Sequence, residues 1–162
     1  MVKESVIDLK KFIVHNNLYL IRLLACGLWA SNEMGPGESA SVMLVVNQPP
    51  RFTSKLHSHV TKRADAENLS VFCRATGKPK PLIRWLKDGF EISTDPKLYE
   101  VITEESEDPN QVFTVKSTFR FMGMDRPSGN RLIPGDRGVY SCVFENEVKR
   151  AESTMHLRIE RT

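Results

Sequence analysis

The chain has 162 residues, of which 40% are hydrophobic and 27% are charged, and both proportions are ordinary for a globular chain. Its formal net charge is only +3, and acids and bases are interspersed, which argues against a nucleic-acid-binding surface. The most apolar run, residues 18–30, is shorter than the roughly 18–20 residues of a membrane span and contains Arg22, so we expect no membrane span in this chain.

Residues 1–29 do not have the pattern of a folded domain. Three lysines precede the apolar run, and small residues lie within its second half at 25–27, which together give the outline of a secretory signal peptide. Glu4 and Arg22 fit that outline poorly, because they place an acid in the basic region and a charge in the apolar region. Apolar residues at helical spacing over 6–14 alternatively predict a short amphipathic helix.

Residues 30–48 predict a β-hairpin. A turn containing glycine and proline separates 30–35 from a predicted strand over 41–46. The pattern is similar to the last hairpin of an immunoglobulin domain, but Leu28 stands where that pattern has cysteine, and Cys26 comes two residues too early. We interpret this segment as the remnant of an upstream domain, joined to a foreign or truncated start. Two prolines at 49–50 then interrupt β pairing and predict a domain boundary.

From residue 51 onward, short predicted strands alternate with turns, and no long helical stripe intervenes. Asp88-Gly89 is a tight-turn dipeptide, an acidic loop is expected over 104–110, and a loop rich in glycine, proline and arginine is expected over 124–137. Several short strands separated by turns are typical of a two-sheet sandwich. The strands are predicted over residues 68–75, 82–87, 90–92, 97–103, 112–121, 139–145 and 151–159.

One constellation of residues is far more specific than the strand pattern. Trp85 stands twelve residues after Cys73, and Tyr140 stands two residues before Cys142, within the run Asp-Arg-Gly-Val-Tyr-Ser-Cys. With these residues, the segment 49–162 resembles an intermediate-set domain of the immunoglobulin superfamily, as found in multi-domain adhesion proteins. The resemblance implies an all-β, Greek-key β-sandwich. The partial hairpin precedes it, and the N-terminal segment with its predicted short helix precedes the hairpin.

The resemblance also implies roles for six residues. A disulfide would join Cys73 to Cys142 across the two sheets, which stabilises by about 4 kcal/mol on the chain-entropy estimate. The odd number of cysteines would leave Cys26 unpaired. Trp85 would cover the bridge with its ring. The remaining three would form the tyrosine corner and shape the approach to its strand: Tyr140, Asp136 and Gly138.

A binding face follows from the same resemblance. Members of this family often bind partners through the sheet that carries the tryptophan strand and the last two strands. Because Trp85, Tyr140 and Cys142 face inward, the residues between them face outward. Such a mixed apolar and basic face could bind another domain, although ordinary protein surface has the same composition. The predicted face comprises Arg84, Leu86, Val139, Ser141, Val143, His156 and Arg158.

The remaining sequence motifs give only weak evidence of a functional site. Asn68-Leu69-Ser70 is a glycosylation sequon, and alternation directs Asn68 outward. His57 and His59 could share one face of a strand, but two ligands make a weak metal site. The acidic residues of 104–108 lack the spacing of a calcium loop. Phosphate loops and nucleophile elbows are absent from the sequence. We therefore expect no catalytic residue, metal or cofactor.

The sequence thus predicts a non-enzymatic protein-binding module of a cell-surface or secreted adhesion protein. Its expected partners are other proteins, above all immunoglobulin-like domains, in homophilic or heterophilic pairs. Two alternatives stay open: an intracellular sarcomeric scaffold, since muscle proteins use the same domain set, and the ectodomain of a receptor enzyme. A formed disulfide and an occupied Asn68 would favour the first reading, because the cytosol keeps thiols reduced.

Overall fold

The computed structural model describes residues 24–32, 35–44, 46–92 and 98–160, with side chains described from residue 46 onward. The chain divides into two compact units, residues 1–46 and 47–162. The first unit contains the antiparallel strands β1 (Leu24–Asn32) and β2 (Gly35–Leu44). The hairpin therefore begins six residues before the expected position 30, and its second strand ends before the expected 46. The predicted helix over 6–14 lies outside the described residues.

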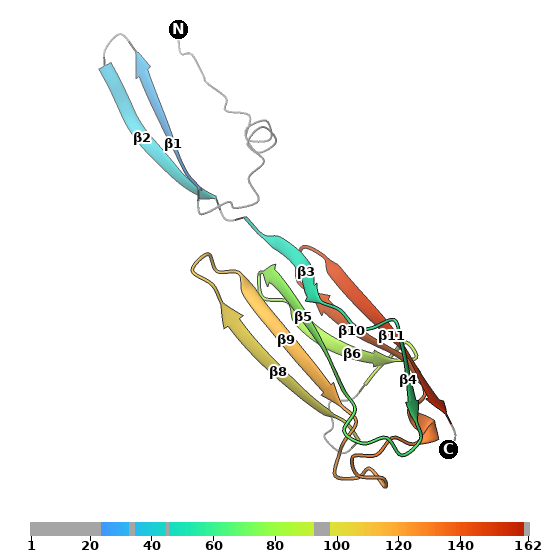
Figure 1. Cartoon of the computed structure of the whole chain (residues 1–162). Coiled ribbons are helices and arrows are strands. Elements are labelled where there is room, and N and C mark those ends of the chain that lie inside the picture. Colours follow the sequence, from blue (N-terminus) through green and yellow to red (C-terminus); the bar gives the residue numbers. More distant parts are fainter. Residues whose placement is uncertain (1–23, 33–34, 45, 93–97, 161–162) are drawn as a thin grey trace. The chain divides into compact units, whose positions relative to one another are not determined.

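The second unit is a two-layer β-sandwich, as the sequence predicted (Figure 1). One layer is a four-stranded sheet in the order β3-β5-β9-β8, and the other is a five-stranded sheet in the order β4-β11-β10-β6-β7. The strands of the first are β3 (Gln48–Ser54), β5 (Ser70–Lys78), β9 (Phe113–Arg120) and β8 (Glu100–Glu107). Those of the second are β4 (His59–Arg63), β11 (Arg150–Glu160), β10 (Gly138–Glu145), β6 (Leu82–Lys87) and β7 (Phe90–Glu91).

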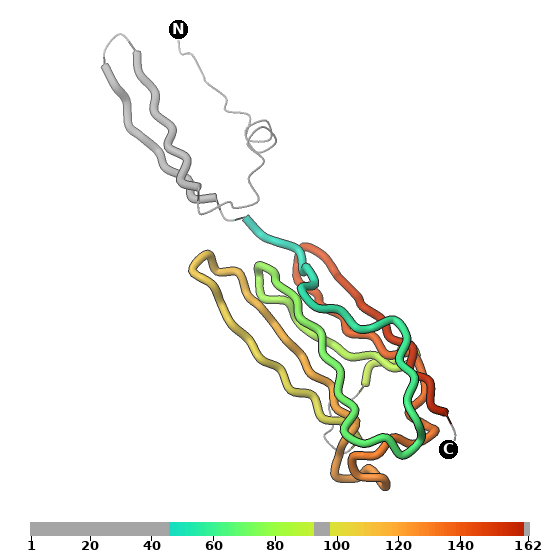
Figure 2. Tube along the Cα trace, viewed as in Figure 1, coloured from blue at the N-terminus to red at the C-terminus, as the bar shows by residue number. Residues whose placement is uncertain are grey.

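The core forms because alternate side chains of each strand point between the layers. On β9, Val115, Ser117 and Phe119 are buried, whereas the residues between them are only partly buried. In Figure 2, the chain passes from β3 in the four-stranded layer to β4 in the five-stranded layer, and then back to β5 in the four-stranded layer. The connection lets β4 pair in parallel with the last strand, β11, while β3 pairs with β5.

Two segments depart from the expected strand limits. Strand β8 runs over Glu100–Glu107, so most of the expected acidic loop 104–110 is an edge strand. Glutamates of β8 form ion pairs with basic residues of β9: Glu104 pairs with Lys116, and Glu100 pairs with Arg120. Charged residues on an edge strand oppose pairing with other chains, which explains why a strand here is rich in glutamate.

The loop between β9 and β10 runs over residues 121–137, and the sequence predicted a loop over 124–137. It contains the short 3-10 helix η1 (Pro134–Asp136), which packs near β11. Leu132 is 2% exposed, so the loop contributes to the core although most of its residues are polar. The backbone of Leu132 also bonds to Ala66 on the opposite connection, which closes this end of the sandwich.

Candidate functional site

The two sheets are joined at their centre by a disulfide. Cys73 on β5 and Cys142 on β10 form this bond, with Cα atoms 6.6 Å apart, and both side chains are fully buried. Trp85 on β6 lies directly opposite Cys142 in the sheet register and is 4% exposed. Its indole Nε1 donates a hydrogen bond to Ser117 Oγ at 2.9 Å, which satisfies the polar atom of the ring inside the core.

Tyr140 has the geometry of a tyrosine corner. Its hydroxyl donates to the backbone oxygen of Asp136, four residues earlier, at 2.7 Å. The side chain is fully buried, and burial raises the pKa of its hydroxyl well above the ordinary range, with a further contribution from Tyr99. The neutral phenol therefore anchors the loop to the start of the inner strand.

The carboxylate of Asp136 holds a buried ion pair. It pairs with Arg126, and these side chains are only 2% and 3% exposed. The same carboxylate accepts a hydrogen bond from the backbone nitrogen of Ile133 at 2.8 Å, and Arg126 also donates to the carbonyl of Arg131 at 3.0 Å. A buried guanidinium is tolerated only with partners of this kind. Sequence reasoning missed Arg126, because a cation inside a polar loop normally faces solvent.

Asp88 organises the start of β10. It follows β6 in the predicted Asp-Gly turn, where Asp88 and Gly89 both have positive φ angles, 51° and 85°. Positive φ angles at both central residues are characteristic of a type I′ turn, in which Asp-Gly is a favoured dipeptide. Its Oδ1 accepts a hydrogen bond from the backbone nitrogen of Val139 at 2.8 Å. The turn therefore fixes both the β6–β7 connection and the entry of the neighbouring strand.

The predicted binding face lies on the outer side of the five-stranded sheet. His156 and Arg158 are exposed on β11, and Arg84 on β6 is 42% exposed. Leu86 and Val139 are half-buried, on β6 and β10. These five side chains alternate with core residues such as Trp85 and Leu157, as expected.

Two members of the predicted face are buried instead. Val143 is 1% exposed and Ser141 is 6% exposed, so the prediction that they contribute open surface is wrong. Val143 lies between Arg84 and Glu152 in the sheet register, and the long stems of such side chains cover apolar surface. Ser141 bonds to the hydroxyl of Thr154 at 3.0 Å. The open part of the face is therefore its end nearer His156.

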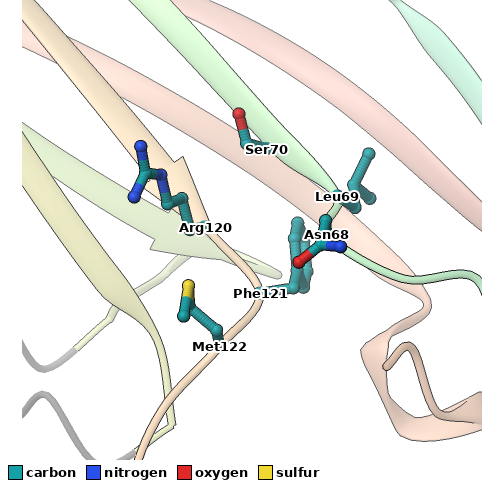
Figure 3. A pocket seen from close by; sticks show the side chains of 6 residues that line it. All are labelled: Asn68, Leu69, Ser70, Arg120, Phe121 and Met122. Atoms are coloured by element: carbon teal, nitrogen blue, oxygen red, sulfur yellow. The ribbon is translucent and has the colours of Figure 1, made fainter. Parts of the chain in front are cut away.

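The sequon asparagine belongs to the other layer. Asn68 lies just before β5, is exposed, and has a φ of 57°. Its Oδ1 accepts a hydrogen bond from Asn130 Nδ2 at 2.9 Å. A hollow of about 250 Å³ lies beside it, lined by residues such as Arg120 and Met122. Figure 3 shows these side chains around the hollow, with Ser70 on the neighbouring strand.

The described residues contain no group of three or more His, Cys, Asp or Glu side chains arranged to hold a metal ion. His57 precedes β4, and His59 is its first residue, so the two do not share a strand as considered from the sequence. His59 instead lies opposite His156 of β11. Among the helices that the structure describes, none is long and apolar enough to cross a membrane.

Comparison with known proteins agrees with this geometry. Neuroglian of Drosophila melanogaster is 29% identical over 131 residues, which cover 80% of this chain and 8% of Neuroglian. Neural cell adhesion molecule 1 of Homo sapiens is 23% identical over 118 residues, covering 73% of this chain and 12% of that protein. The chain thus spans a small part of the curated relatives it matches.

Among solved structures, the I-band fragment I67-I69 from titin is similar with a TM-score of 0.55 and 27% identity, covering 83% of this chain and 41% of that one. A family model described as "Immunoglobulin domain" matches residues 49–146. That segment includes the disulfide, the core tryptophan and the tyrosine corner. The chain belongs to the immunoglobulin domain family.

Proposed function

We propose that this chain is a protein-binding immunoglobulin module of a cell-surface or secreted adhesion or recognition protein, and that it is not an enzyme. The observation that carries the proposal is the buried disulfide between Cys73 and Cys142. Disulfides persist in extracellular compartments and are rare in the cytosol. Relatives that are adhesion proteins, such as neural cell adhesion molecule 1, support the same assignment.

The partner is proposed to bind the outer side of the five-stranded sheet. Its open surface consists of Leu86, Val139, His156 and Arg158, with Arg84 at the side. An apolar centre with basic neighbours suits a contact with another protein domain. Asn68 lies on the connection to β5 in the other layer, so a glycan there would leave this face free. We propose an immunoglobulin-like domain as partner, from a second copy or from a different protein.

A sarcomeric scaffold is the second candidate function, and the similarity to the titin fragment favours it. In that case the chain works in the cytosol, where Cys73 and Cys142 would be kept reduced. The core would then have to be stable without its covalent link. The ectodomain of a receptor enzyme is a variant of the first proposal, with the catalytic activity on another part of the parent protein.

Paired surface variants test the proposed face. Leu86→Asp with Arg158→Glu changes one apolar and one basic residue on the five-stranded sheet. Phe72→Asp with Arg74→Glu is the matched control, because Phe72 and Arg74 are exposed on the other sheet. The control should keep the thermal midpoint within a few degrees, since exposed substitutions cost little. Leu86 is half-buried, so a thermal melt checks that the variant at Leu86 and Arg158 is folded at the assay temperature.

The readout is aggregation of beads coated with the chain, and binding of the soluble chain to a panel of immunoglobulin-superfamily ectodomains. The proposal expects binding in one of these formats, at least tenfold weaker for the variant at Leu86 and Arg158, and unchanged for the control. Binding that both variants retain would overturn the assignment of the face. Absence of binding in every format would overturn the adhesion function.

A further inference from the structure

We propose that His59 and His156 form a surface site for a divalent transition-metal ion that prefers imidazole, with Zn²⁺ as the reference ion. The two residues are 97 positions apart in the sequence and are direct partners in the parallel pairing of β4 with β11. Their rings stack with centroids 5.2 Å apart and planes 14° from parallel. The inference does not rest on the proposed function, because it concerns the isolated chain.

Both imidazoles are on the outer side of the sheet and reach solvent. His156 stands between Met155 and Leu157, which are buried, and His59 precedes Val60, which packs against the core. Two nitrogens bound to one tetrahedral zinc ion lie about 3.3 Å apart, with Zn–N distances near 2.0–2.1 Å. Binding one ion therefore requires the two rings to turn out of the stacked arrangement so that their lone pairs converge, and exposed side chains change rotamer readily.

A second observation concerns the free nitrogen of His59. Its Nδ1 is 3.1 Å from Ser58 Oγ, within hydrogen-bonding distance. When Nδ1–H donates to that hydroxyl, Nε2 has no proton and its lone pair can bind a metal ion. Histidine ligands of metals are held in this way, with the second ring nitrogen donating to a protein oxygen. Ser58 is thus a positioning residue for the proposed ligand.

The surroundings leave room for the ion. Val139 of β10 is the pairing partner of His156 on the side away from β4. Its apolar side chain offers no competing metal ligand. Arg158 follows on the same face of β11, opposite Thr61 of β4, and its exposed guanidinium is screened by water. Two protein ligands leave two positions of a tetrahedral ion open to water. Imidazole pairs suit Zn²⁺, Cu²⁺ and Ni²⁺, whereas Mg²⁺ prefers oxygen ligands.

The test is titration of the full chain, without an affinity tag, with ZnCl₂ at pH 7.4. Isothermal calorimetry gives the dissociation constant, and NMR follows the ring protons of each histidine. The proposal expects the rings of His59 and His156 to shift together and to saturate at one ion per chain, with no shift in MgCl₂. The thermal midpoint should rise in Zn²⁺, because the ion links the edge strand β4 to β11 in the folded state only.

Four variants make the test specific. His59→Ala and His156→Ala should each weaken this binding by about tenfold or more, and Ser58→Ala by about tenfold. His57→Ala is the matched control, because it removes a neighbouring exposed histidine outside the pair, and it should bind as the parent does. Thermal melts without metal check that each variant is folded. Equal zinc affinity in the control and in the two pair variants, or ring shifts in neither histidine, would overturn the proposal.

Discussion

A Cβ atom added at Gly138 would lie 2.9 Å from Oδ2 of Asp88. The φ angle of Gly138 is +154°, a conformation that residues with a side chain rarely adopt. The carboxylate stays close because its other oxygen accepts a hydrogen bond from the backbone of Val139. Glycine is therefore required at this position for two reasons, space and backbone conformation.

We predict that Gly138→Ala lowers the free energy of unfolding by about 1–3 kcal/mol, measured by urea denaturation. Gly135→Ala is the matched control, because the nearest atom to its Cβ would be 3.9 Å away, and it should change stability by about 0.5 kcal/mol or less. If the carboxylate contributes to the cost, Asp88→Ala should be less harmful in the Gly138→Ala background than alone. Strict additivity would show that backbone conformation alone accounts for the loss.

The buried pair of Arg126 and Asp136 gives the largest expected effect of a single loop residue. Arg126→Met leaves the Asp136 carboxylate buried without its cation, which should cost about 3–5 kcal/mol. Arg131→Met removes an exposed pair with Glu67 and should cost about 1 kcal/mol at most. Denaturant midpoints of the two variants compare these costs directly. Similar small losses for both would mean that the loop does not hold the sandwich closed.

Tyr140 predicts a specific loss of stability in alkali. Its pKa is raised in the folded chain, so above pH of about 10 the unfolded state loses a proton that the folded state keeps. Stability due to this group is complete below that pH and falls by up to about 1.4 kcal/mol per pH unit above it. Unfolding of the parent between pH 9 and 11 should be steeper in pH than that of Tyr140→Phe. Parallel curves would contradict the burial of a neutral phenol.

At neutral pH, Tyr140→Phe should be less stable than the parent by about 0.5–1.5 kcal/mol, because the carbonyl of Asp136 loses its hydrogen bond. This difference should shrink as the pH rises above about 10, since only the parent incurs the ionisation penalty. The same denaturation series gives the stability difference at neutral pH and its decrease in alkali.

The central disulfide should contribute about 4 kcal/mol, because it closes a loop with a sequence separation of 69 residues. Cys142→Ala should therefore lose about that amount of unfolding free energy, and so should the parent chain in excess reductant. Agreement between these two losses assigns the effect to the bond. A loss for Cys142→Ala that reductant does not reproduce in the parent would assign it to the cavity left by the sulfur.

Much of the fold could be predicted because strand alternation and the cysteine, tryptophan and tyrosine spacing depend on local chemistry. The predicted strand 82–87 matches β6, and Trp85 faces inward as expected. Alternation also gives the correct direction for Val143. It does not give the exposure, which depends on Arg84 and Glu152 of the two neighbouring strands.

Other features depend on contacts between distant segments, which no local pattern records. Arg126 looks like a solvated loop residue until Asp136 is placed beside it. The spacing of a single strand suggests a shared face for His57 and His59, whereas the observed neighbour of His59 is His156, from the far end of the chain. The limits of β8 were missed because glutamates in a strand resemble a solvated loop until Lys116 and Arg120 of β9 are known to face them.

The most direct test of the extracellular assignment is the intact mass of the chain expressed in secretory cells, with and without reductant. An extracellular module should be secreted, and its mass should rise by about 2 Da on reduction, which marks one disulfide. Peptide mapping should then place the bond between Cys73 and Cys142 and a glycan on Asn68. Protein retained in the cell, with three free thiols and no glycan, would contradict the account and favour the intracellular scaffold.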